Sequence, residues 1–309
     1  MIRCSVILPA AGRGSRFAAG RSGGPNLAAS ASKIELELEG RAVFLRSIDL
    51  FHGRPEVEQI VLAVDPMRYD EFMARWGETL AFMHVDAVPG GTAERWETVA
   101  EALKVVREDV KHIAVHDAAR PATPKAMIDR VFAAAETEDA VIPGLTVADT
   151  LKRIDAAGQD QPAHPGTSDT AGSRADAILG MLDGDGGDGD AQVEAWKASA
   201  GAALGTVTQT VSRDGLVGVQ TPQVFRAEPF RAAYAELASD PAAMVGVTDD
   251  ASLFERRGVP VTVVAGDPGN LKLTRPEDAE LLSALLRYCD AETKQADAVK
   301  DLFGDDDDD

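Results

Sequence analysis

Cysteine and long apolar segments are both scarce in this sequence. Cys4 and Cys289 are the only cysteines among 309 residues, which argues against a disulfide framework and fits a reducing cytoplasm. No apolar run is long enough to span a bilayer, and no charged-then-apolar signal segment follows Met1. The five histidines have no metal-ligand spacing with the cysteines, so a structural zinc site is not expected. These absences predict a cytoplasmic protein without a membrane partner.

Basic residues are also in deficit. The chain has 31 Lys and Arg residues against 51 Asp and Glu residues, a formal net charge of −20. Most of this excess comes from residues 155–205, with nine acidic and two basic residues, and from Asp305–Asp309. We interpret both segments as solvated, disordered chain. Because phosphate contacts need a basic face, no nucleic acid is expected as a partner.

What is present is an alternation of short apolar runs and longer amphipathic stretches, in a chain long enough for one large core. This alternation predicts an α/β fold with a mostly parallel sheet and helices on both faces. A last helix is expected to begin at Pro276. The predicted strands are Ser5–Leu8, Gln59–Val64, His112–Val115, Ala140–Ile142 and Val259–Ala265, and the predicted helices are Ala42–Phe51, Ala93–Val106, Lys125–Ala135 and Glu228–Ala238.

A single domain, residues 1–290, accounts for this pattern. Within it, residues 144–220 are predicted to form a β-arm, a hairpin with strands at Val147–Ile154 and Thr206–Arg213 that carries an acidic, flexible insert at 155–205. The insert is either a tolerated surface insertion or a regulatory or partner-binding segment. Residues 291–309 are predicted to be an acidic, disordered tail.

The segment SVILPAAGRGSRF, residues 5–17, ends an apolar strand in a glycine-rich turn. Such a turn suits phosphate because its backbone N–H groups point outward and a helix N-terminus favours an anion. Phe17 replaces the third glycine of the dinucleotide fingerprint, and the Gly-Lys-Ser/Thr of a Walker A loop is absent. Two interpretations remain: a cradle in which Arg16 reaches a polyphosphate, and a turn that only joins strand to helix.

Further motifs place polar residues near predicted strand ends and helix starts. Asp117 and Arg120 directly follow the strand His112–Val115, where ligands gather in open α/β sheets. Asp117 can hold a divalent cation or a ribose hydroxyl there, or it can simply pair with Arg120. The other motifs are GGTAERWET at 90–98, TPQ at 221–223 and NLKLTRPED at 270–278, which brings Lys272 close to a helix start.

Together, and in chain order, these motifs resemble one family, the 2-C-methyl-D-erythritol 4-phosphate cytidylyltransferases of the non-mevalonate isoprenoid pathway. The ribitol 5-phosphate cytidylyltransferases are near relatives of that family. The resemblance covers residues 3–154 and 206–288 and is carried by LPAAGRGSRF, GGTAERWETV, VHDAARP, ADTLKRID, TVSRDGL, TPQVF, TDDASLFE and NLKLTRPED.

The resemblance implies a Rossmann-like nucleotidyltransferase fold whose protruding β-arm joins two subunits into a homodimer. It implies an enzyme that uses Mg²⁺ to transfer CMP from CTP to 2-C-methyl-D-erythritol 4-phosphate, releasing pyrophosphate. A phosphate monoester has a second pKa of about 6, so it is a nucleophile at neutral pH without a general base. The lack of a Ser-His-Asp or Cys-His set agrees with that chemistry.

The family's residue roles carry over to matching positions of this chain. The implied catalytic residues, which hold the triphosphate and the reacting phosphates, are Arg16, Lys33 and Lys272. The implied nucleotide-binding residues are Ala10, Ala11, Gly12, Gly91, Thr98 and Asp117. The implied substrate-binding residues are Asp117, Arg120, Thr150, Arg213 and Thr221, and Asp117 is also the candidate metal ligand.

The chain departs from the family's pattern in three places. The stretch between Arg16 and Lys33 is longer than usual, the loop that begins at Gly90 has an extra residue, and residues 155–205 expand the tip of the β-arm. Two alternatives stay open, a ribitol 5-phosphate cytidylyltransferase and a non-catalytic nucleotide-binding homologue. A Rossmann dehydrogenase is disfavoured by the missing glycine and by the lack of a paired catalytic His or Tyr.

Overall fold

The computed structural model describes residues 1–12, 32–156, 205–239, 247 and 249–303 of the chain. Arg16 and nearly all of the predicted insert 155–205 lie outside the described residues. The chain divides into two compact units. We call the unit that contains residues 1–21, 26–146 and 217–309 the body, and residues 147–216 the arm.

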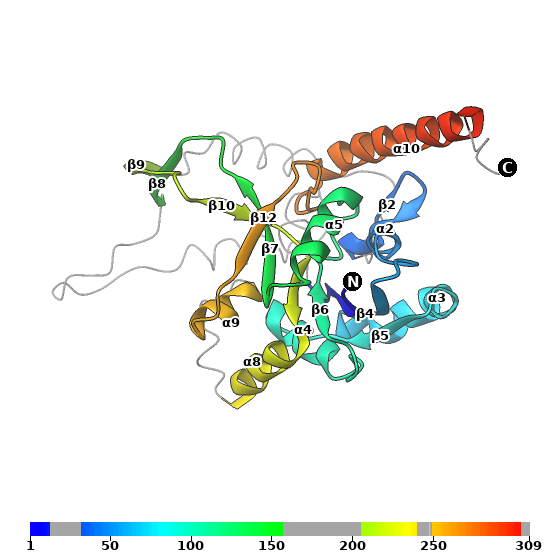
Figure 1. The fold of residues 1–309 in the computed structure, drawn as a ribbon, viewed down its shortest axis with the longest axis horizontal. Helices are drawn as coiled ribbons and strands as arrows, with labels where there is room; N and C mark the ends of the chain where they lie inside the picture. The colour runs from blue at the N-terminus through cyan, green and yellow to red at the C-terminus, as the bar shows by residue number, and fades with distance from the viewer. Residues whose placement is uncertain (13–31, 157–204, 240–246, 248, 304–309) are drawn as a thin grey trace, which may run out of the picture. The chain divides into compact units, whose positions relative to one another are not determined.

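The body is built on a mixed β-sheet (Figure 1). Its strands are β1 Cys4–Ala10, β4 Val57–Val64, β5 Val85–Pro89, β6 His112–Val115, β7 Ala140–Thr146, β10 Val217–Val219, β11 Gln223–Arg226 and β12 Thr262–Ala265. The strand order is β10-β7-β11-β6-β1-β4-β5, and β12 pairs with β7 outside this path. β1 is parallel to β4 and β6, β4 to β5 and β7 to β12, whereas β10 and β11 are antiparallel to their neighbours.

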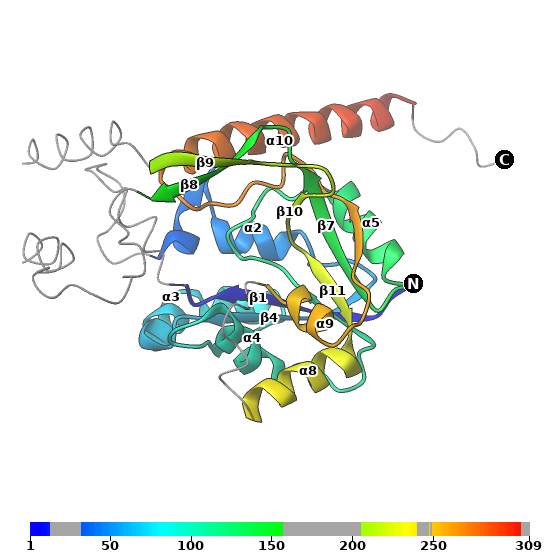
Figure 2. The ribbon, with the colours of Figure 1, turned by 90° about the vertical axis from the view of Figure 1, so that its left-hand side faces the viewer.

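Helices cover both faces of this sheet. They are α2 Val43–Asp49, α3 Tyr69–Phe82, α4 Arg95–Leu103, α5 Lys125–Ala134, α8 Ala227–Ser239 and α9 Ala251–Arg256. In β1, Val6 and Leu8 belong to the core under α2, α3 and α5, whereas Ile7 belongs to the core under α4, α8 and α9. Figure 2 shows α2 and α5 on one side of β1 and β4, with α4 and α8 on the other. The predicted α/β class is therefore confirmed.

The predicted elements are present with small differences in length. All five predicted strands and all four predicted amphipathic helices occur, although β12 begins at Thr262 rather than at Val259. We did not predict α3, β5 or β11. β11 begins two residues after Thr221 and pairs between β6 and β7, so it carries the TPQ motif into the middle of the sheet.

The last helix, α10, runs from Glu277 to Phe303. It includes residues 291–303, which we predicted to be part of a disordered tail, and for these residues that prediction is wrong. Seven of these thirteen residues are Ala, Lys, Glu or Gln, which are strong helix formers and extend a helix that has already begun. Neither α10 nor any other helix in the described ranges has the length and apolar character that crossing a bilayer requires.

The arm contains the predicted hairpin. Its strands β8 (Leu151–Ala156) and β9 (Gly205–Val211) run antiparallel, with Leu151 opposite Val211. Across the pair, Nζ of Lys152 donates to Oγ1 of Thr210 at 2.6 Å. The two strands thus flank the acidic insert as expected.

Candidate active site

Several segments of the body meet at the carboxyl ends of β1 and β6. They line a cavity of about 310 Å³. The lining segments are residues 9–12 at the end of β1, Lys33 and Ile34 of the short 3₁₀ helix η1 (Lys33–Glu35), residues 91–95 with Thr98 around the start of α4, residues 117–119 after β6, and Lys272 and Thr274 before α10. Parallel strands direct their carboxyl ends to one edge of a sheet, which is where open α/β sheets bind ligands.

The structure brings most of the predicted site residues together at this cavity. All six predicted nucleotide-binding residues line it, and so do the predicted catalytic residues Lys33 and Lys272. Nζ of Lys33 donates to the carbonyl oxygen of Leu273 at 3.4 Å, which places the two lysine-bearing segments side by side. Arg16, the third predicted catalytic residue, lies outside the described residues.

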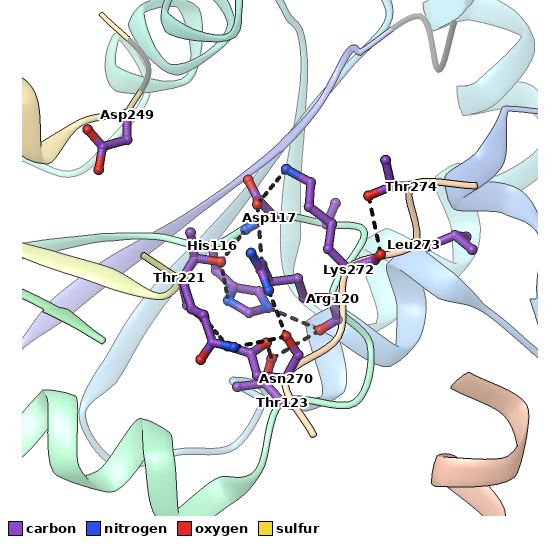
Figure 3. Close-up of polar contacts among 12 residues, drawn as sticks. His116, Asp117, Arg120, Thr123, Thr221, Asp249, Asn270, Lys272, Leu273 and Thr274 are labelled. Carbon is purple, nitrogen blue, oxygen red and sulfur yellow. Dashed lines mark hydrogen bonds and ion pairs between the residues drawn. The ribbon is translucent and has the colours of Figure 1, made fainter. Parts of the chain in front are cut away.

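Asp117 lies at the centre of a cluster of positive charge (Figure 3). Its Oδ2 is 2.8 Å from Nζ of Lys272 and 3.4 Å from Nε of Arg120, and its Oδ1 is 3.5 Å from Nε of Arg95. Burial by itself would raise the pKa of Asp117, but these three cations lower that pKa well below its ordinary value. The carboxylate is therefore ionised at neutral pH and draws three cations to one point of the cavity wall.

Behind Asp117, hydrogen bonds connect the turn after β6 to the TPQ motif (Figure 3). The backbone N–H of Asp117 donates to Oγ1 of Thr221 at 3.1 Å, and this hydroxyl lies 3.2 Å from Nδ1 of His116. Nε2 of His116 lies 3.2 Å from the carbonyl oxygen of Arg120. Burial lowers the pKa of His116 to about 4, so the imidazole is neutral. We therefore assign the imidazole proton to Nε2, which donates to the carbonyl oxygen of Arg120. Nδ1 then accepts from the hydroxyl of Thr221.

A second cavity, of about 420 Å³, adjoins the first. Arg120 and Thr221, two of the predicted substrate-binding residues, line it together with Gln220, Gln223, Asp249 and others. Arg95, Asp117 and Lys272 line both cavities. The predicted residues Thr150 and Arg213 belong to the arm, where Arg213 donates to the carbonyl oxygen of Ala148, and their part in substrate binding stays a prediction.

Arg95 is the main site residue that we did not predict. Its Nη1 lies 2.6 Å from Oδ2 of Asp250, and Oδ1 of Asp250 accepts a hydrogen bond of 2.5 Å from the hydroxyl of Tyr234. Burial lowers the pKa of Arg95, but Asp250 and Asp117 more than offset this and hold its pKa above the ordinary value. Arg95 and Asp250 belong to the motifs GGTAERWETV and TDDASLFE, but they are 155 positions apart, so the sequence alone does not reveal that they pair.

A divalent cation at this site would meet the Asp117 carboxylate at the wall that the two cavities share. In the described ranges, no three His, Cys, Asp or Glu side chains converge into a metal-binding group. Mg²⁺ held by one carboxylate and substrate phosphates needs no such group. Asp117 therefore fits a cation that arrives with a polyphosphate better than one held by protein ligands alone.

Comparison with known proteins points to one family. The family model of 2-C-methyl-D-erythritol 4-phosphate cytidylyltransferase matches residues 4–172 and 195–288. A protein of that name from Acidobacterium capsulatum is 36% identical over 287 residues, which cover 93% of this chain and 98% of that protein. One from Frankia casuarinae is 35% identical over 289 residues, which cover 93% of this chain and 83% of that protein.

Solved structures agree on the fold. The crystal structure of 2-C-methyl-D-erythritol 4-phosphate cytidylyltransferase from Thermus thermophilus matches with a TM-score of 0.60 at 24% identity, covering 93% of this chain and 100% of that one. The 4-diphosphocytidyl-2C-methyl-D-erythritol synthase from Anaerococcus prevotii matches with a TM-score of 0.62 at 23% identity, covering 93% and 96%. The predicted nucleotidyltransferase fold is thereby confirmed.

Proposed function

Because the chain belongs to the 2-C-methyl-D-erythritol 4-phosphate cytidylyltransferase family, we propose that its two adjoining cavities bind CTP and the sugar phosphate. The protein is a cytidylyltransferase of the non-mevalonate isoprenoid pathway. It transfers CMP from CTP to 2-C-methyl-D-erythritol 4-phosphate, which gives 4-diphosphocytidyl-2-C-methyl-D-erythritol and pyrophosphate. The observation that carries the assignment of the cavities is that Asp117, Arg95 and Lys272 line both of them.

CTP is placed in the cavity between β1 and α4. The small residues Ala10, Ala11 and Gly12 on its wall let a flat base and a ribose approach the backbone closely. Lys33 and Lys272 are the cations that neutralise the triphosphate there. Arg16, six residues after the end of β1, is proposed as a further ligand of the triphosphate because it matches the family's motif.

The sugar phosphate is placed in the second cavity, with Arg120 and Thr221. The attacking phosphate then reaches the wall shared by the two cavities, where it meets the α-phosphate of CTP. Thr150 and Arg213 act from the arm of a second subunit in this proposal, as the family's pattern implies for a homodimer. The low cysteine content supports a cytoplasmic location for this enzyme.

The chemistry follows from these positions. A phosphate oxygen of the sugar forms a new bond to the α-phosphorus, and the bond from that phosphorus to the oxygen shared with the β-phosphate breaks. Pyrophosphate leaves with the electron pair of the broken bond. Since the attacking phosphate is already largely dianionic at neutral pH, the protein supplies in-line positioning and positive charge rather than a base. Lys272, close to Asp117 at the shared wall, is the residue best placed to neutralise the reacting phosphates.

Mg²⁺ fits this arrangement as a companion of the triphosphate, with Asp117 as its one protein ligand. The ion would neutralise negative charge on the phosphates. Binding in this way requires the Asp117 carboxylate to share its charge between the ion and Lys272, which lies 2.8 Å from Oδ2.

The test is release of pyrophosphate from CTP and 2-C-methyl-D-erythritol 4-phosphate in the presence of Mg²⁺. Parallel reactions contain ribitol 5-phosphate as acceptor, or UTP or ATP in place of CTP. We expect turnover with CTP and the methylerythritol phosphate, and Lys33→Met and Lys272→Met variants that bind CTP but turn over slowly. Turnover with ribitol 5-phosphate instead would change the substrate assignment. Folded protein that binds CTP without any turnover would support a non-catalytic homologue.

A further inference from the structure

We propose that Glu97 is a positioning residue that makes the loop 91–94 select cytosine over uracil. The proposal rests on the placement of CTP in the cavity between β1 and α4. Glu97 lies in the first turn of α4, directly after the loop. Gly91, Thr92 and Ala93 of the loop line the cavity.

Two side chains of α4 hold all four backbone N–H groups of the loop. Oε2 of Glu97 accepts from the N–H of Thr92 at 3.1 Å, of Ala93 at 2.9 Å and of Glu94 at 3.4 Å. Oγ1 of the next residue, Thr98, accepts from the N–H of Gly91 at 3.2 Å. An ordinary capping box explains only the bond to Glu94, the residue that caps α4. The bonds to Thr92 and Ala93 go beyond helix capping, because these two residues line the cavity.

The direction of these N–H groups determines what the loop offers a ligand. In a trans peptide unit the N–H and the C=O point in opposite directions. With its N–H groups turned toward Glu97 and Thr98, the loop directs the carbonyl oxygens of the same peptide units away from α4. Carbonyl oxygens accept hydrogen bonds, and the exocyclic amino group of cytosine donates them, whereas uracil has a second acceptor at that position. This loop geometry therefore favours cytosine.

The packing leaves the loop little freedom to present its N–H groups instead. A Cβ placed on Gly91 would lie 2.2 Å from Cβ of Glu97 and 2.8 Å from the backbone nitrogen of Thr98. A Cβ on Gly90 would lie 2.8 Å from Cβ of Ala11. Gly90 and Gly91 thus lie close against Ala11 and the start of α4, and the Glu97 carboxylate accepts from the N–H groups of the next three residues.

The experiment compares the wild type with Glu97→Gln and Glu97→Ala. Glu101→Gln is the matched control, because Glu101 is one turn further along α4, pairs with Lys104 at 2.7 Å and lies outside the cavity lining. For each protein, kcat/KM is measured with CTP and with UTP by pyrophosphate release at saturating 2-C-methyl-D-erythritol 4-phosphate. Thermal unfolding is followed in parallel.

In Glu97→Ala we expect the ratio of kcat/KM for CTP to that for UTP to fall about tenfold or more, which is the size of one well-formed hydrogen bond. Glu97→Gln should show a smaller fall, because its amide oxygen can still accept from the three N–H groups. The change should arise mainly from a higher KM for CTP, and the control should keep the wild-type ratio. If Glu97 is only a helix cap, the melting temperature falls while the ratio stays unchanged. That result would overturn the proposal.

A binding experiment separates this proposal from the proposed function. Calorimetric titration of CTP and of UTP into the wild type and Glu97→Ala needs no turnover. If the wild type prefers CTP and Glu97→Ala has a smaller preference, the role of Glu97 is supported even if no acceptor is turned over. If the wild type binds neither nucleotide, or if Glu97→Ala keeps the full preference for CTP, the proposal is refuted. Glu97→Asp, which keeps the charge, replaces either variant that does not fold.

Discussion

The Thr221 hydroxyl offers a sharp test of the structure, because one oxygen atom satisfies two buried groups. It accepts from the backbone N–H of Asp117 at 3.1 Å and donates to Nδ1 of His116 at 3.2 Å. Thr221 is 5% exposed and His116 is fully buried. The perturbation is Thr221→Val, which keeps the shape of the side chain and replaces the hydroxyl with a methyl group.

The magnitude follows from the two groups left without partners. Each buried donor or acceptor that loses its partner costs about 1–3 kcal/mol, and the additional methyl group returns about 0.8 kcal/mol of hydrophobic burial. We therefore expect Thr221→Val to lower the free energy of unfolding by about 2–4 kcal/mol, a large share of the total for a typical domain. The turnover rate should fall as well, because the N–H of Asp117 loses the bond that fixes the turn at the active site.

Urea denaturation followed by fluorescence or circular dichroism measures this loss, with an unchanged m-value as the sign that only stability has moved. Thr137→Val is the control, because the Thr137 hydroxyl bonds to the carbonyl oxygen of Ala134 at 3.3 Å in an exposed position. Its expected cost is within about 0.5 kcal/mol. If Thr221→Val were no more destabilising than Thr137→Val, the hydrogen-bond chain through Thr221 and His116 would not exist as described.

Three further results are expected. Burial lowers the pKa of His116 from its ordinary value near 6.5 to about 4, so the unfolded chain binds the proton more tightly than the folded one. The free energy of unfolding should therefore fall by about 3 kcal/mol as the pH drops from about 6.5 to about 4. Urea titrations at these pH values measure the fall, which should be smaller in His116→Asn. Lys272→Met should lower kcat by a factor of about 10²–10³ with a smaller effect on the KM for CTP in the pyrophosphate assay, and an unchanged kcat would contradict its role. Glu35→Ala removes a buried carboxylate that accepts from Nε1 of Trp76 at 3.2 Å, and it should lower the free energy of unfolding, measured in urea, by about 2–3 kcal/mol. The carboxylate of Glu71 is exposed, so Glu71→Ala should lower the same free energy by less than about 1 kcal/mol.

The local sequence predicted those parts of the site that directly follow a recognisable strand. The runs Ser5–Leu8 and His112–Val115 are apolar enough to be buried strands, so the residues that follow them were expected at one edge of the sheet. The structure confirms this for Gly12 and Asp117, which line the same cavity. Family motifs then named Lys33 and Lys272, whose chemistry alone would not distinguish them from surface lysines.

Other parts of the site depend on contacts between residues that are far apart in the chain. Arg95 forms ion pairs with Asp117 and Asp250, and the residues next to it in the sequence predict neither partner. β11 was not predicted because its sequence, QVFR, has only two apolar residues between polar ones. Its antiparallel place between β6 and β7 nevertheless brings Thr221 to His116. The helix over residues 291–303 was also missed, because these residues were grouped with the acidic end of the chain rather than with the helix before them.

The sequence by itself determined the α/β class, the hairpin of the arm and the family, because hydrophobic period and ordered motifs are properties of neighbouring residues. Only the tertiary structure decided that two cavities share Asp117, Arg95 and Lys272, and that Glu97 turns the loop 91–94 toward α4. The reason is physical. The charge state of Asp117 and the direction of a peptide unit depend on which groups lie within a few ångströms, and sheet order and side-chain packing, rather than local pattern, decide those neighbours.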